Sequence, residues 1–298
     1  MTMQHPRPIH WVMLAVLSIA WGFAFFLIAI GLESFPPLTL VTLRLGVGAM
    51  TLYLIMRWQG LALPGAGQWW WRYILLAICG NLVPFTLIAW GETRITSSQT
   101  GLLMALMPIS TMVLSHFFLE DDPLTPRRLS GVLLGLVGVI VLIGGDLLSS
   151  PDGAQLLAQF AVLTASLSYA INAVYTKRIT PGNTLVVATG TLIVGTAMLL
   201  PVTLYLEQPW LLQPTTGPVL ATLLLGVVST GLATWIYFRV VSDCGPAFLS
   251  IINYIIPALA FGAGVLLLGE PAVFSQFLGL AAICLGIALI QNRAPRTG

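Results

Sequence analysis

Two stretches of the chain, PISTMVLSHFFLEDDP at residues 108–123 and PALAFGAGVLLLGEP at residues 257–271, decide the fold. Each runs from a proline through an apolar segment to an acidic residue and a second proline, and the two lie about half a chain length apart. Further pairs recur at nearly the same spacing: Gly131 and Gly279, Gly138 and Gly286, and the triplets Ala20-Trp21-Gly22 and Ser168-Tyr169-Ala170. The chain therefore contains one unit twice.

The composition excludes a water-soluble domain. Of the 298 residues, 57% are hydrophobic and only 7% are charged, whereas a soluble domain carries about 25% charged residues. The alternating pattern of a membrane β-barrel is absent, and a helix needs about 20 apolar residues to cross a bilayer. Such stretches fall at about 10–31, 38–57, 71–90, 97–118, 128–146, 155–176, 184–206, 217–238, 247–268 and 273–291. We therefore expect an all-α polytopic membrane protein with ten transmembrane helices.

The repeat predicts how the two halves are related. Each copy holds five predicted helices, and because five is odd, the second copy must enter the membrane in the opposite orientation. We expect a first five-helix repeat at residues 10–146, a linker with turn chemistry at 147–154 and a second repeat at 155–292. Inverted repeats are a recurrent transporter design in which the substrate binds between the halves. The sequence thus predicts a central cavity that opens alternately to each side.

The basic residues predict the orientation, because cytoplasmic loops are enriched in Lys and Arg. The loops opposite the N-terminus contain only Arg94, and both termini are therefore expected to be cytoplasmic. The basic residues on the N-terminal side are Arg7, Arg57, Arg72, Arg127, Arg128, Lys177, Arg178, Arg239, Arg293 and Arg296. We interpret them as topology signals and expect no nucleic-acid partner.

The cysteines do not indicate a metal site. Cys79, Cys244 and Cys284 are far apart in the sequence and odd in number, so neither a disulfide framework nor a metal-ligand spacing is supported. We expect no metal, no cofactor and no obligate protein partner.

Motifs in both halves carry a resemblance to a known family. They are Trp21-Gly22, Arg44, Pro108 with Glu120-Asp121-Asp122, and Asn253-Tyr254-Ile255-Ile256-Pro257 with Gly269-Glu270-Pro271. Their order and double occurrence resemble the EamA family of the drug/metabolite transporter superfamily, over nearly the whole chain. The chain looks most similar to YddG-type bacterial aromatic amino-acid exporters. The resemblance implies export of small metabolites across the bacterial inner membrane. In the first half an acidic triplet replaces the usual Gly-Glu turn, so which acid matches Glu270 stays open.

Three prolines inside predicted helices indicate interrupted backbone hydrogen bonding. Pro84, Pro108 and Pro257 lack an N–H and tend to kink a helix. The carbonyls that they would leave without a partner are those of Gly80, Met104 and Asn253. We expect these three points to be helix-breaking or gating positions.

Several polar and aromatic side chains fall well inside the predicted helices. Amides and hydroxyls in lipid are costly unless paired, and in transporters they tend to face the interior or a watery cavity. Hydrogen bonding between helices and simple packing are the alternative interpretations. The candidate substrate-binding residues are Trp21, Arg44, Asn81, Tyr169, Asn172, Asn253 and Tyr254.

Arg44 is the one basic residue clearly inside a predicted helix. An intramembrane charge is by default a functional-site hypothesis. The guanidinium could bind a substrate carboxylate, pair with Glu33 or Glu92, or extend to the membrane surface. All acidic residues map to loops or helix ends, whereas proton-coupled pumps generally bury a carboxylate or His. We therefore expect downhill, uncoupled transport.

These observations together predict a transporter and not an enzyme. Its expected partners are the lipid bilayer and a small amphipathic substrate, with neutral or aromatic amino acids favoured. A proton-coupled drug/metabolite exporter and a nucleotide-sugar-like exporter are alternatives, although the second calls for several cavity cations and only Arg44 is available. A membrane enzyme acting on lipid-linked substrates would need catalytic groups, for which Glu120-Asp121-Asp122 is the only hint. A receptor or a small channel is a further alternative.

Overall fold

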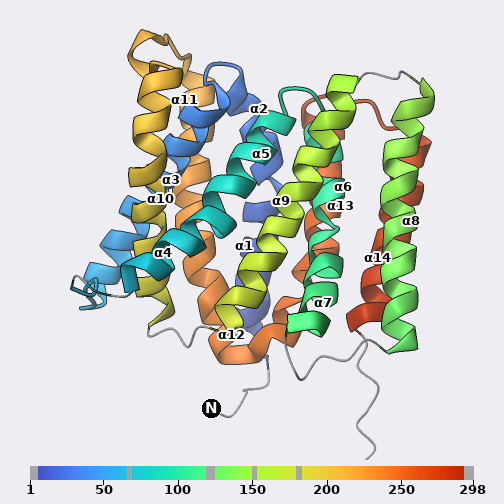
Figure 1. Cartoon of the computed structure of the whole chain (residues 1–298), viewed down its shortest axis with the longest axis horizontal. Coiled ribbons are helices and arrows are strands. Elements are labelled where there is room, and N and C mark those ends of the chain that lie inside the picture. The colour runs from blue at the N-terminus through green and yellow to red at the C-terminus, as the bar shows by residue number, and fades with distance from the viewer. Residues whose placement is uncertain are drawn as a thin grey trace, which may run out of the picture.

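The computed structural model describes residues 6–65, 67, 69–118, 125–149, 153–178 and 183–291. Within these ranges the chain forms helices and no strands (Figure 1). Nine segments of the described chain are long and apolar enough to cross a membrane, and a shorter apolar helix, α13 (Ile252–Leu267), accompanies them. The prediction of an all-α polytopic membrane protein is confirmed. The acidic triplet Glu120-Asp121-Asp122, the middle of the predicted linker, and Arg293 and Arg296 lie outside the described residues.

The helices follow one another along the chain with short connections. The first half contains α1 (Pro8–Gly22), α2 (Ala24–Leu32), α3 (Pro37–Trp58), α4 (Trp69–Ala77), the π-helix η1 (Ile78–Leu82), α5 (Val83–Gly91), α6 (Ser97–Met104), α7 (Met107–Phe118) and α8 (Pro126–Ser149). The second half contains α9 (Gly153–Arg178), α10 (Thr184–Leu206), the short 3-10 helix η2 (Pro209–Leu211), α11 (Thr216–Leu224), the π-helix η3 (Leu225–Leu232), α12 (Ala233–Leu249), α13 and α14 (Phe274–Gln291).

The two halves interlock. In Figure 1, α1 rises from the end where the N-terminus lies, which we call the lower end, whereas α9 descends from the upper end. The helices α3, α6 and α8 of the first half pack on α10, α13 and α14 of the second half, respectively. Likewise α1 packs on α12 and α13, and α9 packs on α5 and α7. The core is therefore built mainly from contacts between the halves.

Glycines allow the closest of these contacts, between α8 and α14. A Cβ atom on Gly286 would lie 2.6 Å from the carbonyl oxygen of Gly131, and one on Gly138 would lie 2.8 Å from that of Gly279. Small residues let helix backbones approach this closely in a membrane. The glycines that recur in the two halves thus face one another.

Both middle crossings contain a π-helix, η1 in the first half and η3 in the second. The expected break at Pro84 follows η1 directly, but the carbonyl that this proline leaves without a partner differs from our expectation. The N–H of Val83 donates to Ile78, five residues earlier, so in the same register Pro84 leaves the carbonyl of Cys79 unpaired, not that of Gly80. The Ser168 hydroxyl from α9 donates to the Cys79 oxygen at 2.9 Å. A side chain of one half thus supplies the hydrogen bond that a backbone carbonyl of the other half lacks.

The other two prolines lie in different settings. Pro108 is the second residue of α7, directly after an interruption at residues 105–106, and the first turn of a helix needs no N–H there. Pro257 lies inside α13. The interruption next to this helix comes earlier, at residues 250–251, and the preceding crossing ends at Gly245, whose φ of 80° suits glycine. Asn253 and Tyr254 therefore lie in the first turn of α13.

We expect Ser168→Ala to destabilise the protein by about 1–3 kcal/mol, because the partly buried Cys79 carbonyl would lose its donor. Pro84→Ala supplies an N–H that can reach this carbonyl, so Ser168→Ala should cost less in that background. A double-mutant cycle of unfolding free energies in detergent measures the coupling. Ser130→Ala is the control, since the exposed Ser130 hydroxyl donates only to Arg127 of its own helix. Strictly additive effects of the two changes would contradict this account.

Candidate substrate-binding site

Arg44 of α3 is buried in the interface between the halves, with 7% of its surface exposed. Its Nε donates to the Thr230 hydroxyl at 2.9 Å, and its Cζ lies 3.8 Å from the centre of the Phe85 ring. No carboxylate lies within ion-pair distance of this guanidinium in the described part of the chain. A cation held by a hydroxyl and an aromatic face retains unused capacity for a carboxylate.

Three elements position the residues around Arg44. Thr230 belongs to η3, and its hydroxyl donates to the Leu225 carbonyl at 2.9 Å, which leaves its oxygen free to accept from Arg44. Phe85 of α5 lies 6.3 Å, centre to centre, from the ring of Tyr169 of α9, at an interplanar angle of 63°. The Tyr169 hydroxyl is close enough to Arg44 for their charges to interact. Both halves of the chain therefore contribute to this site.

Glu92 completes the group, which we call the Arg44 cluster: Arg44, Phe85, Glu92, Tyr169 and Thr230. It follows α5, and both of its carboxylate oxygens are buried without a hydrogen-bond partner among the described residues. Burial raises the pKa of the Glu92 carboxyl well above its ordinary value of 4.5; the charge of Glu270 raises it further, and Arg44 opposes the shift. Glu33, the other proposed partner of Arg44, is exposed. Glu92 lies at a helix end, as the sequence predicts, but its carboxylate oxygens are buried, a property that proton-coupled pumps generally share.

Trp21 lies beside this cluster and contacts the same π-helix. Its indole Nε1 donates to the Ser229 carbonyl at 3.0 Å, and the Ser229 hydroxyl donates to the Ala20 carbonyl at 2.7 Å. Its ring centre is 5.7 Å from that of Tyr237. Trp21 and Tyr169, which match in the repeat, thus each contact a π-helix-containing crossing of the opposite half.

The amides of Asn81 and Asn172 come from η1 and from the facing helix α9. Asn172 packs over Gly80, where an added Cβ would lie 2.8 Å from its Nδ2. The Oδ1 of Asn172 is buried without a partner, and the Asn81 amide makes no hydrogen bond within the described residues. Since buried polar groups are normally satisfied, these two amides are available to a polar ligand.

No hydrogen bond, ion pair or ring contact joins Asn253 or Tyr254 to the Arg44 cluster in the part of the chain that the structure describes, although Tyr254 packs against the same apolar core as Tyr169. Their N–H groups donate to Ser250 and Ile251, at 3.1 and 3.2 Å, in the turn that starts α13. The Tyr254 hydroxyl lies near Cys284 of α14. These two residues therefore belong to a separate region, nearer the lower end of the bundle.

Carboxylates from the second half cap helices of the first half at the upper end. Glu270 accepts hydrogen bonds from the N–H groups of Ser97 and Ser98, at 2.8 and 2.9 Å, and from the Ser97 hydroxyl at 2.9 Å. Glu207 accepts from the N–H groups of Leu38 and Thr39, at 3.0 and 2.6 Å, and from the Thr39 hydroxyl at 2.8 Å. Negative charge at a helix N-terminus is favourable. These caps hold the two halves together at that end.

Polar contacts also join the halves at the lower end. His10 of α1 is buried, accepts a hydrogen bond from the N–H of Arg7 at 3.0 Å, and lies 3.6 Å from Asp243 of α12. Asp243 pairs with Arg239 at 3.0 Å. Within the described residues, no group of three or more His, Cys, Asp or Glu side chains could hold a metal ion.

Two residues of the Arg44 cluster, Phe85 and Thr230, were not among the sequence candidates. Phe85 follows Pro84, and Thr230 lies in the stretch LGVVSTGL, where Gly226 and Gly231 pack closely against α3. The glycines are the one sequence signal that could have pointed to this region. The rest of the assignment depends on contacts between the halves.

The chain is similar to known proteins in sequence and in fold. The family model of the EamA-like transporter family matches residues 9–144 and 156–291. The chain is 29% identical over 279 residues to the uncharacterized transporter YoaV of Bacillus subtilis, covering 93% of this chain and 95% of the relative. It is 28% identical over 289 residues to the uncharacterized inner membrane transporter YedA of Escherichia coli K12, covering 93% and 89%. A protein of known crystal structure has the same fold, with a TM-score of 0.70 at 18% identity, covering 95% and 96%.

Proposed function

Because the chain belongs to the EamA-like transporter family and is a multi-pass membrane transporter, we propose that it exports small amphipathic metabolites, chiefly neutral and aromatic amino acids. The substrate binds between the two halves, which expose it alternately to each side. Transport is downhill, and the protein needs no partner besides the bilayer and the substrate.

The Arg44 cluster is the observation that carries this proposal. Arg44 is a buried guanidinium without a carboxylate ion pair among the described residues, and a guanidinium binds a carboxylate through two parallel hydrogen bonds. The guanidinium lies over the Phe85 ring, and the half-buried ring of Tyr169 next to Phe85 can pack against an apolar side chain. A site that offers a cation next to aromatic rings matches the carboxylate and the ring of an aromatic amino acid. A nucleotide sugar, with two phosphate groups, would need more cations than this cluster supplies.

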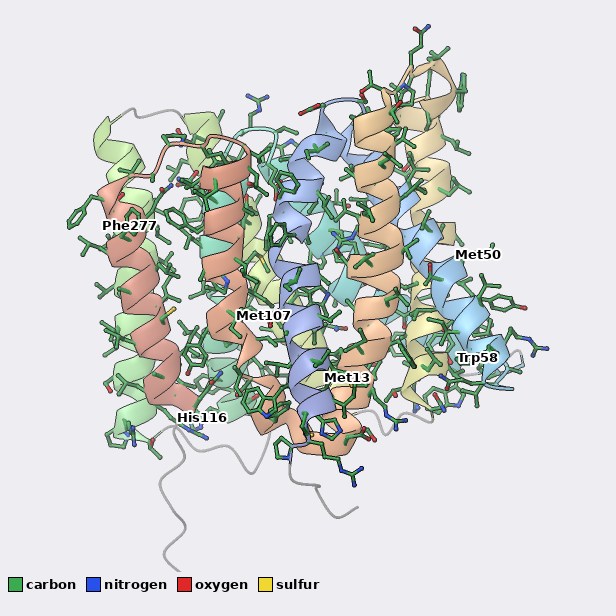
Figure 2. All side chains as sticks on the ribbon, turned by 180° about the vertical axis from the view of Figure 1, so that it is seen from behind. Met13, Met50, Trp58, Met107, His116 and Phe277 are labelled. Atoms are coloured by element: carbon green, nitrogen blue, oxygen red, sulfur yellow. The ribbon has the colours of Figure 1, made fainter. Side chains whose placement is uncertain are left out.

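We further propose that the lower end faces the cytoplasm and that the membrane is the bacterial inner membrane. The lower end carries the N-terminus, the end of α3 at Trp58 and the end of α7 near His116 (Figure 2). Basic residues gather on these lower connections, in line with the enrichment of cytoplasmic loops in Lys and Arg. The relative YedA is named as an inner membrane transporter.

The test is transport by purified protein in proteoliposomes, with the same pH on both sides. Phenylalanine, leucine, lysine, a nucleotide sugar and phenethylamine form the substrate panel. We expect phenylalanine to be carried at least about tenfold faster than phenethylamine, because only phenylalanine has a carboxylate for Arg44. Uptake of the nucleotide sugar without uptake of any amino acid would refute the proposal, as would a strict requirement for a pH gradient.

Variants of Asn253 and Tyr254, at the start of α13, refine the location of the binding site. Asn253→Ala and Tyr254→Phe are compared with Asn172→Ala, which removes an amide that packs on η1. If the substrate passes the start of α13 during transport, the two changes there slow transport. Wild-type rates from both, together with a slow Asn172→Ala variant, would restrict the site to the Arg44 side.

A further inference from the structure

The Glu92 carboxyl has no role in the transport cycle described so far, yet its environment is unusual. Both oxygens are buried, and neither has a hydrogen-bond partner in the described part of the chain. An ionised carboxylate taken out of water without hydrogen bonds or a contacting cation is several kcal/mol less stable than its protonated form. Glu92 therefore holds a proton in this conformation.

The charged and ionisable groups around Glu92 come from several elements. Arg44 lies on α3, and Glu270 lies on the connection before α14; both act electrostatically on Glu92. Of the elements packed on α5, α9 contributes Tyr169, η1 contributes Cys79, and α2 carries no ionisable side chain. Glu270 already accepts three hydrogen bonds at the start of α6. Among the described residues, Arg44 is thus the cation that acts electrostatically on a deprotonated Glu92.

The same cation is the proposed partner of the substrate. The Arg44 guanidinium uses its Nε for Thr230, and no carboxylate lies within 4.0 Å of it in the described residues. Two anions can therefore neutralise one cation: the carboxylate of the substrate or that of Glu92. Since the site supplies no second cation, each anion disfavours the other.

We propose that Glu92 is a proton-binding site that controls access to Arg44. When Glu92 is protonated, the guanidinium is available to the carboxylate of the substrate. When the carboxyl releases its proton to water at the upper face, the resulting carboxylate becomes the counter-ion of Arg44 and competes with the substrate. The competition rests on the function proposed above, whereas the proton site itself does not.

The direction of the pH effect follows from linkage. Substrate binds the protonated form, so binding above the pKa of Glu92 requires uptake of one proton. Affinity then falls by about tenfold for each pH unit above that pKa and is constant below it. Acidification of both sides accelerates downhill transport, and the lack of uphill accumulation under a pH gradient distinguishes this control from a proton-driven pump.

The proton site is tested first, without any substrate. Infrared spectra of the purified protein are recorded at rising pH, starting from about pH 5, where an ordinary carboxyl is already ionised. We expect a protonated-carboxyl band in the wild type that weakens once the pH exceeds the pKa of Glu92 and that is absent from Glu92→Gln. Glu33→Gln, which changes an exposed acid at the same end, should retain the band. A wild type without the band, or a band that persists in Glu92→Gln, overturns the proposal.

The competition is tested by binding of phenylalanine over the same pH range. Wild type and Glu33→Gln should lose affinity as pH rises, whereas Glu92→Gln should bind with the affinity of the acidic wild type at every pH. An unchanged pH profile in Glu92→Gln overturns the competition. If no variant binds phenylalanine, the function proposed above fails and the competition fails with it, while the infrared result still decides the proton site.

Discussion

Arg44→Gln is expected to weaken phenylalanine binding by about 10- to 100-fold. The change removes a charged hydrogen-bonding partner of the carboxylate, and such interactions contribute about 1.5–3 kcal/mol. Binding of phenethylamine, which lacks the carboxylate, should not weaken. Calorimetry or a scintillation proximity assay with both ligands measures the difference. The two ligands together separate a lost carboxylate contact from general damage to the protein.

Two further variants sharpen this result. Arg94→Gln changes an exposed arginine at the same end of the bundle and should leave both affinities unchanged. Arg44→Lys retains the charge but loses the planar guanidinium and its contact with Phe85. Its affinity for phenylalanine should therefore lie between that of Arg44→Gln and that of the wild type. Equal losses for phenylalanine and phenethylamine in Arg44→Gln would assign Arg44 a purely structural role.

Gly286→Ala is expected to destabilise the folded protein by about 1–3 kcal/mol or more. The new Cβ would lie 2.6 Å from the Gly131 carbonyl oxygen and 2.9 Å from the Gly135 nitrogen. Both are backbone atoms and cannot move aside as a side chain can, so α8 and α14 must separate along their interface. Thermal unfolding in detergent, followed by circular dichroism, measures the loss.

Gly144→Ala is the matched control on α8. No heavy atom lies within 4 Å of the Cβ that it would add, and alanine favours a helix over glycine by about 1 kcal/mol. We therefore expect Gly144→Ala to raise the melting temperature slightly and Gly286→Ala to lower it. Equal shifts in the same direction would show that the α8 and α14 backbones are not in contact.

The crossings could be predicted from the sequence because lipid imposes a simple requirement. Helices of about 20 apolar residues and closed β-barrels satisfy it; the alternation of a barrel is absent, and the predicted stretches correspond to the observed helices. The interruptions were harder to predict. Pro84 and Pro108 do mark irregular points, but the interruption after α1 at Phe23 and the π-helix η3 contain no proline. They depend on how the opposite half packs, which no local pattern encodes.

The candidate site was predicted in part, for a physical reason. Arg44 was recognisable because a charge inside a membrane helix needs an explanation, and Tyr169 because it repeats Trp21. Glu92 was placed at a helix end and named as a possible partner of Arg44, but its position in the sequence does not reveal that its carboxylate oxygens are buried. Thr230 joins the cluster only through its hydrogen bond to Arg44 across the two halves.

The caps that Glu270 and Glu207 provide set a threshold for opening the upper end. They comprise six hydrogen bonds between the halves, each contributing about 1 kcal/mol. A rocking motion that separates the halves there has to break them as a set. A ligand populates the open form only by favouring it to a comparable extent. We therefore expect the empty transporter to be closed at that end, which would limit leakage when no substrate is bound.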